Sequence, residues 1–166
     1  MELKQQLIRE MIQYETGAPG RIQHFLKVHS FAELIGKGEH LEEDVQSTLE
    51  IASIVHDIGI KPAMEKYASG AGNLQELEGP PVAEEMLTKL GCPQDVISRV
   101  SYLVGHHHTY SHIEGIDYQI LVEADFLVNL HENQATEETI LNTYHNIFKT
   151  ETGKYICKTM FGLEEK

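Results

Sequence analysis

Apolar residues recur with the period of an α-helix along almost the whole chain of 166 residues. No segment shows the strict alternation of a half-buried strand. Glycine, proline and capping signals divide the pattern into about seven segments, and they predict helices over residues 2–16, 21–35, 43–56, from Pro81 to Gly91, from Pro93 to the histidine run, over 118–131 and 137–149, with a further short one in the tail from Thr152. The sequence therefore predicts an all-α fold, a compact bundle of about six to eight helices in one domain over residues 1–166.

Residues 57–79 are expected to form the longest irregular segment, with one short turn at 64–67. They contain four glycines and a proline. A long loop inside a compact domain is usually functional or mobile. We therefore expect residues 61–77 to form a lid that selects the substrate.

The composition excludes several classes of partner. The chain has 26 acidic and 13 basic residues, a formal net charge of −13, which disfavours nucleic-acid polymers and anionic lipid surfaces. Its apolar runs are too short for a membrane span, and the charged N-terminal residues do not resemble a signal peptide. The only two cysteines form no CxxC motif. We therefore expect a protein of the reducing cytoplasm that binds neither membranes nor nucleic acids.

Histidines on apolar helix faces are the strongest functional signal. Projection at about 100° per residue places His24, His56, His107 and Asp125 on the apolar face of four different predicted helices. A lone histidine there is usually a hydrogen-bonded core residue. A buried carboxylate, however, needs a cation or several donors, and no Lys or Arg lies within 118–130. A divalent cation would satisfy all four side chains, so we predict a metal site in the helical core.

Other polar residues on these helices are assigned to different surroundings. Glu123 points away from the face that carries Asp125. Because three consecutive helical residues point in three directions, His108 is expected to be a supporting or surface residue. Four histidines show no partner pattern and are expected at the surface, namely His40, His112, His131 and His145.

The order of the histidines and aspartates along the chain matches a known sequence pattern. The segments are RIQHFLKV, ASIVHDIG, EGPPVAEEML, VGHHHT and VEADFL, in that order. From about residue 21 to 130 the chain resembles the HD superfamily of metal-dependent phosphohydrolases. The resemblance implies an HD-domain fold and a first metal ion held by His24, His56, Asp57 and Asp125.

Members of this superfamily with two metals add further ligands, and the resemblance extends to these with one departure. It implies that Glu78, His106 and His107 hold a second ion, with Asp57 as the bridge. Glu78 stands where those members have histidine, and an oxygen ligand favours Mn, Fe or Mg over Zn. We therefore expect one or two divalent ions. The subfamily that hydrolyses cyclic dinucleotides carries Gly-Tyr-Pro after its histidine pair, whereas this chain reads HHHTYSHIEG, which disfavours that activity.

The resemblance implies hydrolysis of a phosphoester in a small phosphorylated substrate, with nucleotides as the commonest class, by a metal-activated water. Asp57 and Asp125 would be the catalytic residues. Lys61 is the nearest cation in sequence and a candidate phosphate contact, and Arg21 lies one helical turn before His24. Two alternatives stay open, a non-catalytic metal- or nucleotide-binding regulatory domain and a di-iron oxygenase. The first and last helices are compatible with a homodimer.

Overall fold

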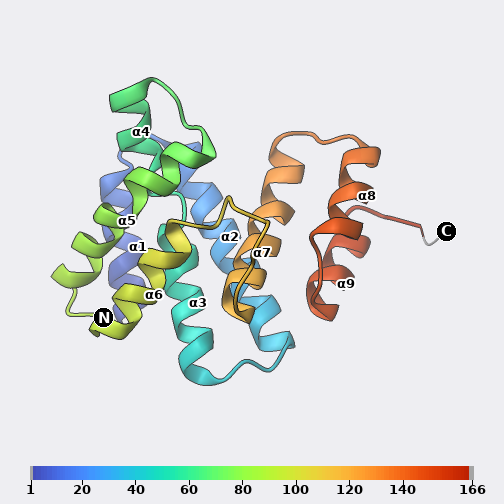
Figure 1. Cartoon of the computed structure of the whole chain (residues 1–166), viewed down its shortest axis with the longest axis horizontal. Helices are drawn as coiled ribbons and strands as arrows, with labels where there is room; N and C mark the ends of the chain where they lie inside the picture. Colours follow the sequence, from blue (N-terminus) through green and yellow to red (C-terminus); the bar gives the residue numbers. More distant parts are fainter. Residues whose placement is uncertain (1, 165–166) are drawn as a thin grey trace.

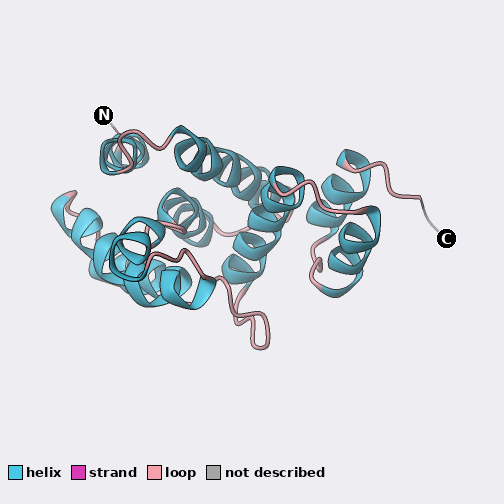
Figure 2. Ribbon diagram, turned by 90° about the horizontal axis from the view of Figure 1, so that it is seen from above, coloured by secondary structure: helices cyan, strands magenta, loops and turns pink. Residues whose placement is uncertain are grey.

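The computed structural model describes residues 2–164, and within this range the chain forms nine α-helices and no strand (Figures 1 and 2). The all-α prediction is therefore confirmed. None of the helices in this range combines the length and apolar character required to cross a bilayer. The helices are α1 (Leu3–Tyr14), α2 (Pro19–Gly38), α3 (Glu43–Val55), α4 (Ile60–Tyr67), α5 (Gly72–Lys89), α6 (Gln94–Val104), α7 (Ile116–Glu132), α8 (Glu137–Asn146) and α9 (Glu151–Met160).

The segment 57–79 was predicted to be irregular, and this prediction is wrong. It contains α4 and the first turns of α5, so the expected lid over 61–77 is largely helical. Pro80 and Pro81 lie inside α5 rather than at its start. A proline at position 80 removes the helical partner of the Glu76 carbonyl. Gly105 packs beside that carbonyl, because a Cβ on Gly105 would lie 3.3 Å from the Pro80 ring and 3.6 Å from the Glu76 oxygen. Helix α5 therefore packs against the end of α6 at the point where Pro80 and Pro81 would be expected to interrupt it.

Helices α2, α3 and α7 form the centre of the molecule. Helix α2 packs along both α3 and α7, α6 packs on α3 and α5, and α1 packs on α3. Figure 1 shows α8 and α9 together beyond α7, at the opposite end from α1, α5 and α6. The shared core includes fully buried Phe25, Leu49, Leu103 and Leu121. The polar side chains described below therefore lie within the apolar centre rather than on a loop at its edge.

A close backbone contact fixes the turn after α3. A Cβ built on Gly59 would lie 2.4 Å from the carbonyl oxygen of Gln75 and 2.7 Å from the backbone nitrogen of Gly79. Any side chain at position 59 would push α5 away from this turn. The turn carries Asp57, so the contact between Gly59 and α5 holds that carboxylate in place.

The connection between α6 and α7 is anchored at both ends. The Tyr118 hydroxyl lies against the backbone carbonyl oxygens of His106 and Thr109. Arg99 donates to both carboxylate oxygens of Asp117, at 2.9 and 2.7 Å, and to Glu114 at 2.8 Å. These contacts fix the course of the chain through the histidine run.

Candidate metal centre

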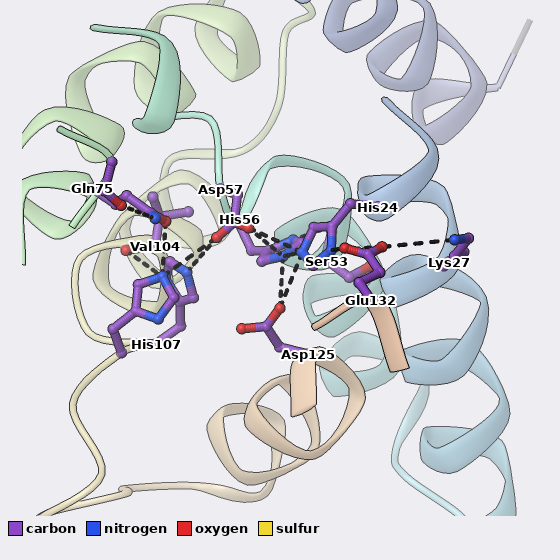
Figure 3. Close-up of polar contacts among 12 residues, drawn as sticks. His24, Lys27, Ser53, His56, Asp57, Gln75, Val104, His107, Asp125 and Glu132 are labelled. Carbon is purple, nitrogen blue, oxygen red and sulfur yellow. Dashed lines mark hydrogen bonds and ion pairs between the residues drawn. The ribbon is translucent and has the colours of Figure 1, made fainter. Parts of the chain in front are cut away.

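Four buried side chains from three parts of the core meet at one point (Figure 3). His24 comes from α2, His56 and Asp57 from the end of α3 and the turn after it, and Asp125 from α7. The Nε2 atom of His24 lies 3.0 Å from Oδ2 of Asp57 and 3.2 Å from Oδ1 of Asp125. The Nε2 atom of His56 lies 3.4 Å from each of the same oxygens. The structure thus brings together the first ligand set expected from the sequence, which we call the first group.

For His24 and His56, the hydrogen bond at Nδ1 determines whether Nε2, which faces the other ligands, carries a proton or a lone pair. Nδ1 of His56 lies 2.7 Å from the carbonyl oxygen of Ser53, and Nδ1 of His24 lies 3.1 Å from a carboxylate oxygen of Glu132. Both partners only accept, so each Nδ1 carries the proton and each neutral ring presents a lone pair at Nε2. These two Nε2 atoms face each other at 3.1 Å. The arrangement needs a cation or extra protons between them.

Asp125 also needs a cation or a proton beside it. Its Oδ1 atom is buried and has no hydrogen-bond partner. Burial alone would lower the pKa of His24, but the carboxylates of Asp125 and Asp57 outweigh it and raise that pKa to about 9. Burial and the charge of Asp57 would raise the pKa of Asp125, yet its contacts with His24 and His56 hold it well below the ordinary value. Imidazole and carboxylate donors with an unpartnered buried oxygen are a donor set that fits a divalent cation.

A second group of donors shares Asp57 with the first. The Oδ1 atom of Asp57 lies 2.8 Å from Nε2 of His107 and 3.5 Å from Nε2 of His108, on the other side from His24. The Nδ1 atom of His107 lies 2.9 Å from the Val104 carbonyl oxygen, which again leaves Nε2 free to ligate. Asp57, His107 and His108 form this second group. One carboxylate placed between two sets of donors is the arrangement that a bridging ligand of two ions requires.

The structure does not bring Glu78 or His106 to either group. Glu78 faces α4, where it accepts from Lys66 at 2.7 Å and from the Tyr67 hydroxyl at 2.8 Å. The ring of His106 stacks on Tyr102 with a centroid distance of 4.0 Å. The histidine pair beside Asp57 is therefore His107 and His108 rather than His106 and His107. The sequence predicts a supporting or surface position for His108, whereas the structure places its half-buried ring 3.5 Å from Oδ1 of Asp57.

The end of α6 explains this difference. The helix ends at Val104, and the three histidines follow in a turn that begins at Gly105. Helical projection therefore no longer applies to them, and two neighbouring rings point to the same carboxylate. Gly105 was the available signal, since glycine commonly ends helices.

Lys61 does not face the metal centre. Its Nζ atom donates to the backbone carbonyl of Tyr14 at 2.9 Å and lies 4.6 Å from the centre of the Tyr14 ring. It thereby joins α4 to α1. The four histidines expected at the surface, His40, His112, His131 and His145, are all exposed.

A pocket of about 580 Å³ opens onto the first group from the side of α2. Arg21 and Lys27 stand on either side of His24 along this helix. Arg21 donates to the buried carboxylate of Glu15 at 2.8 Å. Polar side chains from α2, α5 and α7 complete the wall, together with Asp57 and His108, namely Gln23, Gln75, Asn129 and Glu132. The pocket therefore combines metal-type donors with two cationic side chains.

A third group of metal-type donors lies between α2 and α3, away from the pocket lining, and consists of His29, Glu33 and Glu50. Here the carboxylates already have cationic partners. Glu50 pairs with Lys4 at 3.2 Å and Glu33 with Lys37 at 2.6 Å. These lysines neutralise the carboxylates of the third group. The donor groups around Asp57 differ, because no lysine pairs with Asp57 or Asp125 among the described contacts.

Comparison with known proteins gives one family model and one solved structure similar to this chain. The family model described as the HD domain matches residues 21–154. A solved structure described as a predicted HD superfamily hydrolase, from an uncultured Thermotogales bacterium, superimposes with a TM-score of 0.64. That match has 21% sequence identity and covers 94% of this chain and 82% of the other, so it shows a shared fold. No curated protein matches the chain.

Proposed function

The chain belongs to the HD domain family, and from this premise we propose that it is a metal-dependent phosphohydrolase acting on a small phosphorylated compound. The observation that carries the proposal is the pair of donor groups around Asp57, with the unpartnered Oδ1 of Asp125 beside them. Nucleotides are the first substrate class to test. The pocket volume of about 580 Å³ lies in the range of small-molecule sites.

Divalent ions bound by these groups would supply Lewis-acid chemistry, which polarises a phosphoryl oxygen and lowers the pKa of water towards neutrality. His24, His56 and Asp125 would hold one ion and His107 the other, where His108 would join it by exchanging its 2.8 Å contact with the Gln75 amide oxygen for the ion. Asp57, whose Oδ2 atom contacts the first group and whose Oδ1 atom contacts the second, would be shared by both.

Asp125 has a further part in the proposed reaction. Its Oδ1 atom is directed at the point where the first group converges and has no hydrogen-bond donor of its own. It is therefore available to ligate an ion at that point, and the ion-bound carboxylate would orient the attacking water. A carboxylate already saturated with hydrogen bonds could not do this.

The wall of the pocket supports an anionic substrate. Arg21 and Lys27 flank His24, so a phosphoryl group over the first group would have a cation on each side. Glu15 holds the Arg21 side chain in position through its 2.8 Å contact. Each cation also has a carboxylate partner, Glu15 at 2.8 Å for Arg21 and Glu132 at 3.7 Å for Lys27, so they would offer hydrogen-bond donors to a phosphate rather than a net positive charge.

The proposal is tested with the protein loaded with Mn²⁺ and desalted. It is assayed against p-nitrophenyl phosphate, bis-p-nitrophenyl phosphate and a panel of nucleoside monophosphates. We expect metal-dependent release of phosphate or p-nitrophenol, abolished in Asp57→Ala and retained in His112→Ala. Protein that retains metal but turns over none of these phosphoesters would contradict the proposal and favour a regulatory domain.

A further inference from the structure

Glu132, the last residue of α7, contacts the metal centre from the pocket side. Its two carboxylate oxygens lie 3.1 and 3.3 Å from Nδ1 of His24. One of them also lies 3.7 Å from Nζ of Lys27. Figure 3 shows this row of side chains running from Lys27 through Glu132 to His24. Neither Lys27 nor Glu132 was singled out from the sequence.

The contact distinguishes His24 from His56 and His107. His56 and His107 are each oriented by a backbone carbonyl three residues earlier, in Ser53 and Val104. Substitution of a side chain does not remove those acceptors. His24 lies within α2, and the acceptor that faces its Nδ1 belongs to a side chain of another helix. The orientation of this one ligand therefore depends on a single replaceable carboxylate.

A carboxylate that accepts from the distal nitrogen of a ligating histidine has two effects. It fixes the tautomer, so that Nε2 presents its lone pair to the ion, and it makes the ring a stronger donor. Loss of such a partner typically weakens metal binding by about 10- to 100-fold.

We propose that Glu132 is a positioning residue that orients His24 as a metal ligand, with Lys27 holding the other side of the carboxylate at the pocket wall. This inference rests on the proposed metal site. It adds that the hydrogen bond between Glu132 and His24 joins α7 to α2 at the site, in addition to the link that a shared metal ion would make. Lys27 is 47% and Glu132 31% exposed in their side chains, so both can be replaced without opening the core.

The test measures Mn²⁺ affinity, with no reliance on turnover. Free Mn²⁺ is followed by electron paramagnetic resonance during titration of the whole protein and of Glu132→Leu, Glu132→Gln and Lys27→Met. We expect Glu132→Leu to weaken binding by about 10- to 100-fold. Glu132→Gln keeps an acceptor oxygen for Nδ1–H and should recover most of the affinity. Lys27→Met leaves the contact with His24 intact and should stay within about threefold of the wild type.

Two results would overturn the inference. One is wild-type affinity in Glu132→Leu. The other is an equal loss in Glu132→Gln and Glu132→Leu, since the neutral amide would rescue a hydrogen-bonding part but not a purely electrostatic one. Melting temperatures of the metal-free variants show whether each is folded. A wild-type protein that binds no Mn²⁺ would contradict the proposed function itself, and it is thereby distinguished from a failure at Glu132 alone.

Discussion

Helix α7 carries two buried carboxylates two residues apart, and their surroundings are opposite. Glu123 faces α9 and is fully buried. It accepts from the Thr150 hydroxyl at 2.6 Å, from the backbone N–H groups of Lys149 and Thr150 at 3.0 and 3.1 Å, and from Gln119 at 2.7 Å. Asp125 faces α2 and α3, and its buried Oδ1 atom has no hydrogen-bond donor.

The difference separates a structural carboxylate from a ligand. Four donors compensate Glu123 for the loss of water, and its carboxylate closes the start of α9 so tightly that a Cβ on Gly153 would lie 1.8 Å from Oε1. Asp125 has only imidazole nitrogens nearby, and these present lone pairs in their neutral form. A buried carboxylate with a full set of donors thus needs no cation, whereas one without them does.

Among the substitutions of proposed metal ligands, Asp57→Ala should have the largest effect on metal binding and activity. It removes the one carboxylate shared by both groups, and the charge that His107 and His108 face. We predict loss of bound metal and loss of activity below detection. Elemental analysis and the phosphoester assay check this, with His112→Ala on the exposed loop as the unchanged control. Activity lost in His112→Ala would show that the loop has a direct part in the reaction.

A matched pair on α7 tests the comparison itself. Asp125→Asn should lower activity by at least about 100-fold and weaken Mn²⁺ binding. Glu123→Gln should leave metal binding unchanged but destabilise the protein by about 2 kcal/mol, because an amide nitrogen would face backbone donors. Thermal melting and Mn²⁺ titration of both variants measure the two effects. The distinction fails if Glu123→Gln loses metal as Asp125→Asn does.

The histidine run offers a second matched pair. His108→Ala should weaken the binding of one ion by about tenfold or more, as loss of a ligand or its close partner does. His106→Ala should leave metal binding unchanged, because the ring is stacked on Tyr102 away from Asp57. Stoichiometry and affinity for Mn²⁺ measure both. The reverse order of effects would restore the pair expected from the sequence.

Acidity should affect the metal centre through His24. Its pKa of about 9 in the absence of metal means that an ion must displace a proton at neutral pH, so Mn²⁺ affinity should rise between pH 6 and 8, by up to about tenfold per unit for one proton. A histidine pKa raised by folding adds stability below its unfolded value of about 6.5. This stability is lost as the pH rises towards 9. The melting temperature of EDTA-treated protein should therefore fall as the pH rises from about 6.5 to about 9. A rise over this pH range would contradict the contacts of His24 with the two aspartates.

Helical periodicity was sufficient for most of the fold and for part of the site. His24 and Asp125 lie on α2 and α7, and His56 at the end of α3, so the regular turn of a helix predicted their inward direction. The pairing of Asp57 with these residues came from the family resemblance, because Asp57 lies in a turn whose direction a helical projection does not give.

The remaining parts depend on tertiary contacts that the sequence does not encode locally. Helix α5 continues through Pro80 and Pro81, with Gly105 packed beside the Pro80 ring, and Glu78 on this helix contacts α4 instead of the metal centre. The contact of Glu132 with His24 joins residues 108 positions apart. Neither relation leaves a periodic signal.

Metal content by elemental mass spectrometry tests the central claim most directly. The wild type and Asp57→Ala are loaded with Mn²⁺, desalted and measured side by side. We predict about two equivalents in the wild type, one for each donor group that shares Asp57, and none in the variant. A wild-type protein without metal, or equal metal in both proteins, would contradict the assignment of these residues as a metal centre.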